Sequence, residues 1–340
     1  MIWNAHQFVD RETQQVCTEQ LFHDHQVHFM YTRLREQTPG LFRLLTRPWL
    51  SGLLGFLNYD IAFRGWIRGP AEFCQELGVN IEECLEGAKQ LNTPRKVFER
   101  KIRYWECRPL PLDPRAIVSP SDSRVLVGSL SQDSGLFLKE KFFSYEELLG
   151  TDRQDWLKEF DEGDYAIFRL TPEKYHYNHT PVSGRVLDIY EIQGDHHSCN
   201  PGGVVTLVTP YSKNKRVVTI FDTEVANGTG TGLVAMIEVV ALMVGEIIQC
   251  YSDREYENPR PVVPGMFLTR GMPKSLFRPG SSTNVLLFQK GRVHFAEDLV
   301  RNLTRPGIQT RFSQGFGRSL VETDIKVRSL LAHGRKAESL

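Results

Sequence analysis

The pattern of apolar and polar positions changes about a third of the way along the chain. Up to about residue 105, apolar residues recur at helical spacing, as in residues 72–91, and Asn92-Thr93-Pro94 follows as a helix stop signal. From about residue 114 the apolar runs are short and rich in β-branched residues, and Gly, Pro, Asn and Asp separate them. The pattern therefore predicts helices first and a sheet afterwards.

The expected fold class is α+β, with an N-terminal helical region and then a β-rich mixed catalytic domain. The expected strands include residues 125–127, 203–208, 217–221 and 285–288. The longer apolar run 232–248 predicts one long helix that packs against the sheet. We expect a helical region over 1–105, a catalytic domain over 106–317 and a charged C-terminal tail over 318–340 that frays.

Residues 41–69 combine leucines and aromatic residues with four arginines and a single acid, Asp60. This composition suits a helix that lies in the membrane interface. The alternative is a buried helical hairpin of the core, with Pro48 and Gly55 as its breaks.

Composition narrows the class of protein. Hydrophobic residues make up 41% of the chain and charged residues 24%, and the 41 basic residues balance the 41 acidic ones. The zero net charge argues against a dedicated nucleic-acid binder. Six scattered cysteines without a CxxC pair fit a reducing compartment, and the first residues lack the features of a secretory signal. We expect a cytoplasmic protein, with peripheral membrane association as the alternative.

The segment Pro279-Gly280-Ser281-Ser282-Thr283 places hydroxyl residues between a turn and an apolar strand. A serine that follows a flexible glycine can attack the glycine carbonyl with its hydroxyl. The chain then cuts itself, and the serine becomes a pyruvoyl group at the new N-terminus. An ordinary turn is the alternative for this segment taken alone.

Two further segments hold residues that could assist such a reaction. His176 and His179 lie three apart in a stretch flanked by prolines, and histidine moves protons near neutral pH. Asp122 lies in an expected turn between two short strands. Together with Ser281 these residues supply a nucleophile, a base and a carboxylate that could orient the base.

Several of these segments follow one another in the order of one enzyme family. They are Val118-Ser119-Pro120-Ser121-Asp122-Ser123-Arg124-Val125, residues 142–150, Arg169-Leu170 through Tyr175-His176 and His179 to Gly184, Asn214-Lys215-Arg216-Val217-Val218, Phe221-Asp222-Thr223 and Gly280-Ser281. The chain resembles the phosphatidylserine decarboxylases, which process themselves and use a pyruvoyl group. The resemblance covers about residues 95–295, and the first hundred residues match more loosely.

The resemblance implies a role for each residue. Ser281 would attack Gly280, which releases residues 1–280 and leaves a pyruvoyl group at the head of residues 281–340, and the two products would stay associated. Asp122 and His179 would serve as orienter and base, and His176 would assist decarboxylation. The pyruvoyl group would form a Schiff base with the amine of phosphatidylserine, and phosphatidylethanolamine and CO2 would leave. No metal and no diffusible cofactor would be needed.

Departures from the family pattern leave alternatives open. Ser282 could be the nucleophile with Ser281 in the glycine position, and Tyr177 stands where the family has arginine. These changes favour, as an alternative substrate, a free amino acid, aromatic ones included. A further alternative function is that of a lipid-binding relative without catalysis. A homodimer is an alternative for the oligomeric state. His196, His197 and Cys199 have the side chains of a zinc or iron site but lack a second ligand set.

Overall fold

The computed structural model describes residues 5–21, 24, 29–38, 40, 42, 70–131, 142–207, 209–241, 246–279 and 282–335. The candidate membrane-interfacial segment 41–69 therefore lies outside the described residues, except for Phe42. Gly280 and Ser281 also lie outside them.

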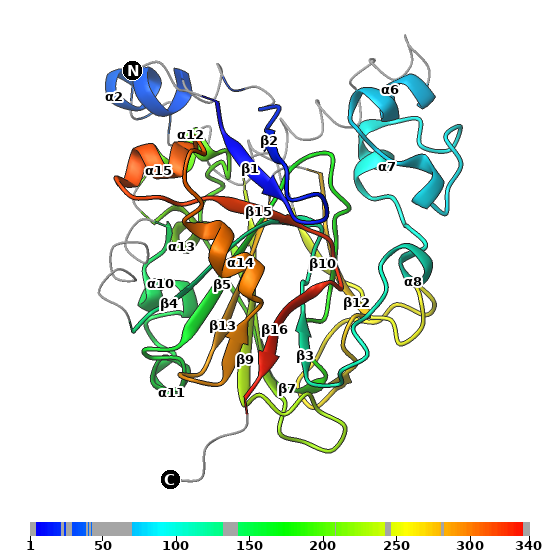
Figure 1. Ribbon diagram of the computed structural model, residues 1–340. Helices are drawn as coiled ribbons and strands as arrows, with labels where there is room; N and C mark the ends of the chain where they lie inside the picture. Colours follow the sequence, from blue (N-terminus) through cyan, green and yellow to red (C-terminus); the bar gives the residue numbers. More distant parts are fainter. Residues whose placement is uncertain are drawn as a thin grey trace.

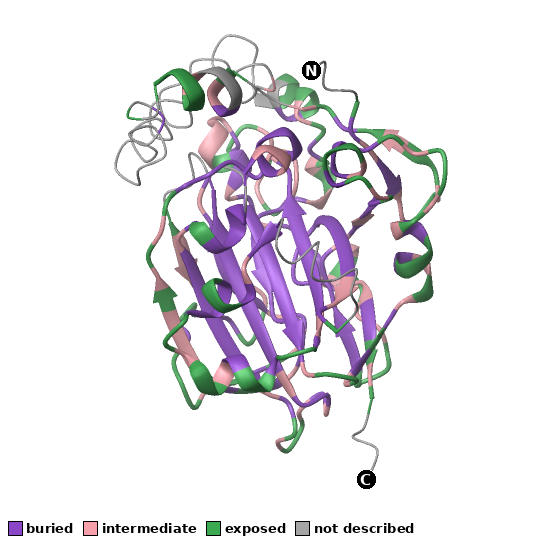
Figure 2. Ribbon diagram, turned by 90° about the vertical axis from the view of Figure 1, so that its left-hand side faces the viewer, coloured by how far each residue is buried: buried purple, intermediate pink, exposed green. Residues whose placement is uncertain are grey.

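The described chain is built around a ten-stranded, mainly antiparallel sheet (Figure 1). In spatial order its strands are β11 (Phe267–Leu268), β7 (Gly184–Ile192), β8 (Arg216–Asp222), β9 (Leu233–Val240), β13 (Ser282–Phe288), β5 (Asp164–Leu170), β4 (Ser123–Ser129), β15 (Glu322–Ile325), β1 (Gln7–Asp10) and β2 (Val16–Thr18). Strand β13 lies near the centre of this sheet, and all seven of its residues are buried. Figure 2 shows that most of the sheet is buried and that the exposed residues lie at its rims.

Two smaller sheets accompany the large one. The first contains β10 (Ile247–Gln249), β12 (Pro273–Phe277) and β6 (Tyr177–His179), and the second contains β14 (Val293–Phe295), β16 (Leu330–Gly334) and β3 (Ala116–Val118). The second sheet and α14 supply residues to the core on one face of the large sheet, among them Ile117, Leu299 and Leu331.

Short helices cover the remaining faces. The helical segments are η1 (Met30–Leu34), α2 (Arg35–Gln37), α6 (Pro70–Glu76), η2 (Ile81–Glu83), α7 (Pro94–Phe98), α8 (Tyr104–Cys107), α10 (Tyr145–Leu149), α11 (Gln154–Glu159), α12 (Pro201–Thr206), α13 (Pro210–Lys213), α14 (Glu297–Leu303) and α15 (Arg311–Phe316). Helices α10 to α13 and α15 pack on the other face of the large sheet. The region from α6 to α8 packs instead against β6 and β12.

The mixed α and β character is confirmed, but the single long helix expected over 232–248 is wrong. Residues Leu233–Val240 form β9, and Ile247–Gln249 form β10. Strand β9 is buried on both faces between the two core layers, so all of its residues except Glu238 are apolar. A continuous apolar run does not distinguish a fully buried strand from a buried helix by its periodicity.

Four other local expectations also differ from the structure. Residues 7–18, within the expected helical region, contain β1 and β2, and residues 203–206 belong to helix α12 and not to a strand. The fraying expected beyond residue 318 does not occur over 322–334, because β15 pairs with β1 and β4, and β16 pairs with β14 and β3. Thr93-Pro94 starts a helix here, since the Thr93 hydroxyl caps α7 by accepting from Lys96 N at 3.2 Å.

Candidate active site

Two chain segments run side by side and bring the candidate residues together. Strand β5 leads through residues 171–176 into β6, and β12 leads through residues 278–281 into β13. At one end Leu170 pairs with Ser282. At the other end Phe277 N donates to the His176 carbonyl at 3.1 Å. Phe277 and Ser282, the described residues on either side of the candidate cleavage point, are therefore held against the two ends of the segment that contains His176.

His176 is fully buried and has one free ring nitrogen among the described residues. Its Nδ1 lies 2.7 Å from the Lys174 carbonyl oxygen, so Nδ1 carries the proton. Its Nε2 has no hydrogen-bond partner in the described part of the chain. The ring packs on Phe98 of α7 at 3.6 Å between centroids. Burial, and then the nearby Arg100 guanidinium, hold the pKa of His176 well below its usual value, which leaves a neutral ring whose Nε2 can accept a proton.

Both ring nitrogens of His179 are already engaged. Nδ1 donates to the Gly271 carbonyl at 2.8 Å, and Nε2 accepts from the Tyr175 hydroxyl at 3.0 Å. Tyr175 in turn lies 2.7 Å from the Tyr256 hydroxyl. Burial lowers the pKa of His179 to about 3, so this ring is also neutral.

Asp122 makes its contacts with groups other than the two histidines. Arg108 donates to both of its carboxylate oxygens, at 3.1 and 2.8 Å, and Val327 N donates to Oδ1 at 2.7 Å. Burial would raise the pKa of Asp122, but the Arg108 guanidinium outweighs it and holds the pKa below its usual value. The Asp122 loop still contacts the histidine strand, because His179 N donates to the Pro120 carbonyl at 2.7 Å.

The serines lie at the start of β13. Gly280 and Ser281, the predicted cleavage point, are outside the described residues. Ser282 is fully buried and opens β13, between Leu170 of β5 and Val240 of β9. Its hydroxyl has no hydrogen-bond partner among the described residues.

Sequence reasoning did not identify the charged residues buried near these strands. Arg108 holds Asp122, and Lys274 forms an ion pair with Glu238 at 2.6 Å, in which both side chains are 0% exposed. The signal was present in the sequence, since Glu238 interrupts the otherwise apolar residues of β9. A charge inside a fully buried strand is rare unless the charge is paired.

Another buried charge cluster contains residues that could hold a metal ion. Ligand atoms of His6, Glu19 and Glu322 lie within 4.8 Å of one another. However, Arg169 donates to both Glu19 and Glu322 at distances of 2.6 to 3.0 Å, so a cation of the protein already neutralises the two carboxylates. The donor set therefore fits an ion-pair network better than a metal site.

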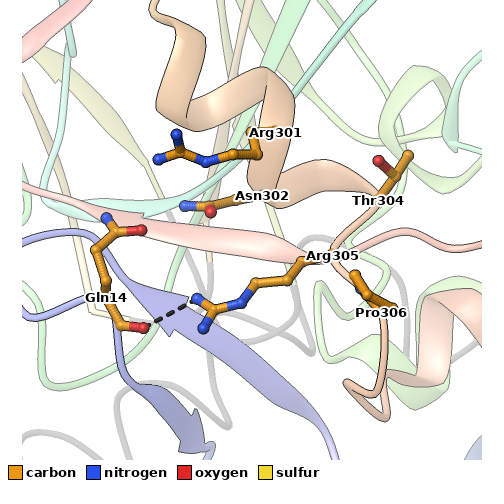
Figure 3. A pocket seen from close by; sticks show the side chains of 6 residues that line it. All are labelled: Gln14, Arg301, Asn302, Thr304, Arg305 and Pro306. Atoms are coloured by element: carbon orange, nitrogen blue, oxygen red, sulfur yellow. Dashed lines mark hydrogen bonds between the residues drawn. The ribbon is translucent and has the colours of Figure 1, made fainter.

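The cavity drawn in Figure 3 is separate from the candidate residues. It has a volume of about 510 Å³ and is lined by Gln14, Arg301, Asn302, Thr304, Arg305 and Pro306. Asp122, His176, His179 and Ser282 do not line it. In the described part of the chain, the candidate residues are instead buried between the strands.

Comparison with known proteins relates the chain to an enzyme family. The sequence profile described as phosphatidylserine decarboxylase matches residues 95–318, about two thirds of the chain. A phosphatidylserine decarboxylase proenzyme of Chlamydia caviae is 30% identical over 323 residues, covering 93% of this chain and 99% of the relative. The phosphatidylserine decarboxylase proenzyme of Ruminiclostridium cellulolyticum is 29% identical over 310 residues, covering 91% of this chain and 95% of the relative.

A self-processing carboxy-lyase is the class of enzyme that these comparisons define. The chain belongs to the phosphatidylserine decarboxylase family. Among the residues that the structure describes, none of the helices has the length and apolar character needed to cross a membrane.

Proposed function

We propose that the chain cuts itself to form a pyruvoyl group and decarboxylates phosphatidylserine to phosphatidylethanolamine. One observation carries the proposal beyond family membership. The residues on either side of the candidate cleavage point are fixed, since Phe277 contacts His176 and Ser282 pairs with β5. His176 is a buried, neutral histidine with a free nitrogen, which suits it to moving a proton in the decarboxylation step.

Self-cleavage would use groups of the chain and one water molecule. A base removes the proton of the serine hydroxyl, whose oxygen attacks the Gly280 carbonyl, and the peptide nitrogen leaves to give an ester. Elimination breaks the serine Cβ–O bond and releases residues 1–280 with a free carboxylate. The dehydroalanine that remains takes up water and loses ammonia, which leaves a pyruvoyl group on residues 281–340.

The candidate residues keep the roles predicted from the sequence. Asp122, His179 and Ser281 are the proposed cleavage set, and His176 is the proposed acid for the decarboxylation step. The contacts support His176 most directly, because its Nε2 is free while both nitrogens of His179 are engaged. Breaking the bond from Tyr175 would have to precede the action of His179 as a base.

The residues around the cleavage point fit a pyruvoyl group. The Ser282 hydroxyl, next to the proposed nucleophile in sequence, and His176 Nε2 are buried polar atoms without a described partner, as groups that meet a bound reactant would be. Once formed, the pyruvoyl group supplies a carbonyl that condenses with the substrate amine and withdraws electrons as CO2 leaves.

The two products of cleavage would stay together. Residues 282–335 supply β13 with β14 to β16, and β13 pairs on both sides with strands of the larger product, β9 and β5. Separation would expose a fully buried central strand, which is strongly unfavourable.

We also propose peripheral association with membranes, which vesicle flotation tests.

Intact-mass measurement of the purified protein tests the proposed cleavage. Fragments 1–280 and 281–340, the second carrying a pyruvoyl group, are expected, and Ser281→Ala should abolish them. Cleavage one residue later, lost in Ser282→Ala, would move the nucleophile to Ser282. An uncut chain that is stable on incubation would overturn the proposal.

Release of CO2 from phosphatidylserine vesicles and from free amino acids tests the proposed substrate. The amino-acid alternative has one structural observation in its favour. Tyr177, at the family's arginine position, packs against Tyr175 and Tyr256 and offers no cation to a phosphate group. Release from aromatic amino acids alone would select this alternative.

A further inference from the structure

A buried polar network lies on the same sheet face as Ser282 at the start of β13. It comprises Asn178, Glu238, Lys274, Ser275 and Asn284, all of which are 0% exposed. These residues come from β6, β9, β12 and β13. The network therefore connects the strand that carries His179 with the strand that begins at the cleavage point.

The ion pair fixes the role of each Glu238 oxygen. Lys274 Nζ donates to Glu238 Oε2 at 2.6 Å, which keeps Glu238 a charged group that only accepts hydrogen bonds. Its Oε1 accepts from the Ser275 hydroxyl and from Asn178 Nδ2, the latter at 3.3 Å. The amide of Asn178 must therefore turn its NH2 group toward Glu238.

This orientation passes on to Asn284. Because Asn178 directs its NH2 group to Glu238 and to Ser275 Oγ at 3.1 Å, its Oδ1 points the other way. That oxygen accepts from Asn284 Nδ2 at 2.8 Å, and Ser121 Oγ accepts from the same NH2 group at 3.2 Å. Asn284 Oδ1 is left as a buried acceptor without a partner among the described residues.

The unpartnered oxygen lies close to the reacting end of the strand. Ser282 and Asn284 are two residues apart on β13, so their side chains point to the same face, with Cα atoms about 7 Å apart. The Ser282 hydroxyl also lacks a partner. A hydroxyl and an amide oxygen on one strand face are therefore without a partner in the described part of the chain, and the amide oxygen can only accept.

We propose that Asn284 positions the substrate by accepting a hydrogen bond from its amine, and that Glu238 and Lys274 hold the Asn284 amide in the orientation this requires. The inference rests on the proposed function, because that function demands an amine beside the head of β13. Asn284 lies three residues beyond Ser281, the proposed source of the reacting carbonyl, and an acceptor there suits an ammonium group, which has only donors.

Access to Asn284 follows from access to the reacting residue. In the uncut chain both Ser282 and Asn284 are fully buried. Cleavage before Ser281 or Ser282 creates a chain end two or three residues from Asn284. A substrate that reaches a carbonyl at this end comes to the same part of the strand.

The test uses processed wild-type protein and Asn284→Val, compared by intact mass and by binding. The probe is dihexanoyl phosphatidylethanolamine, the soluble short-chain product, and its N-acetyl derivative lacks the ammonium group. Calorimetry should show about a 10- to 100-fold weaker Kd for the amine probe in Asn284→Val, as expected for a lost hydrogen bond to a charged group. Binding of the N-acetyl probe and the extent of cleavage should not change.

Asn302→Val is the matched control. Asn302 is also a buried asparagine with an unpartnered amide nitrogen, but it lines the separate cavity of Figure 3, so this variant should bind both probes as wild type does. If Asn284→Val does not fold, the double variant Glu238→Gln with Lys274→Met decides, since it removes the orientation of the amides without leaving an unpaired charge. It should weaken binding of the amine probe alone.

Three results would overturn the assignment. They are an unchanged Kd for the amine probe, an equal loss for both probes, or loss of cleavage in folded Asn284→Val. Failure of the proposed function would look different, because the wild-type chain would then stay uncut or release no CO2 from phosphatidylserine.

Discussion

Replacing Lys274 by methionine should strongly destabilise the protein. Lys274 and Glu238 are both 0% exposed, so the change leaves an unpaired carboxylate in the core. Breaking a buried ion pair on one side typically lowers the free energy of unfolding by about 3–5 kcal/mol. Hydrogen bonds to Glu238 from Gln249, Ser275 and Asn178 remain, which places the expected loss in the lower half of that range.

A double-mutant cycle isolates the contribution of the pair. Glu238→Gln alone leaves a buried ammonium group and should lower the free energy of unfolding by about 3 kcal/mol. The double variant has no buried charge and should lose only about 1–2 kcal/mol, so that the coupling between the two sites is about 5 kcal/mol.

The cycle is measured by urea denaturation in a chain that carries Ser281→Ala and Ser282→Ala. These changes prevent cleavage, so unfolding is not complicated by separation of two products. Losses below about 1 kcal/mol for both single variants, or a double variant as unstable as their sum, would refute the description of a desolvated, mutually dependent pair.

Three further predictions follow from other buried side chains that are charged or can be protonated. Asp122→Asn should lower stability above about pH 4 and matter less below it, because the folded-state pKa is depressed and the carboxylate's contribution is lost as pH falls; urea titrations at several pH values check this. His179 is neutral when folded but takes up a proton below about pH 6.5 when unfolded, so it should lower the free energy of unfolding by up to about 1.4 kcal/mol per pH unit as the pH falls from about 6.5 to 3. A folded His179→Gln variant should show a correspondingly shallower pH profile. Arg169→Met should lower the free energy of unfolding by about 3–5 kcal/mol, since Glu19 and Glu322 lose their shared cation, and a melting temperature equal to wild type would contradict this.

Local patterns in the sequence predicted the β-rich character of the chain but not every element. The alternation of short β-branched runs with turn residues after residue 114 correctly indicated strands such as β4, β8 and β13. The run that became β9 could not be assigned from periodicity, because both of its faces are buried against core layers supplied by distant parts of the chain. Strand β15 could not be found in a charged tail, since it exists only by pairing with β1 and β4.

The candidate site shows the same division between local and long-range information. The glycine–serine pair and the two histidines are local motifs, and the sequence alone predicts them as reactive residues. The orientation of Asn284 depends on Glu238 and Lys274, which lie 36 residues apart in sequence, and on Asn178, which lies 106 residues from Asn284. A hydrogen-bond acceptor acquires its direction only when all of these strands are assembled. Residues that react can therefore be recognised from a motif, whereas residues that orient a substrate become visible only in the folded sheet.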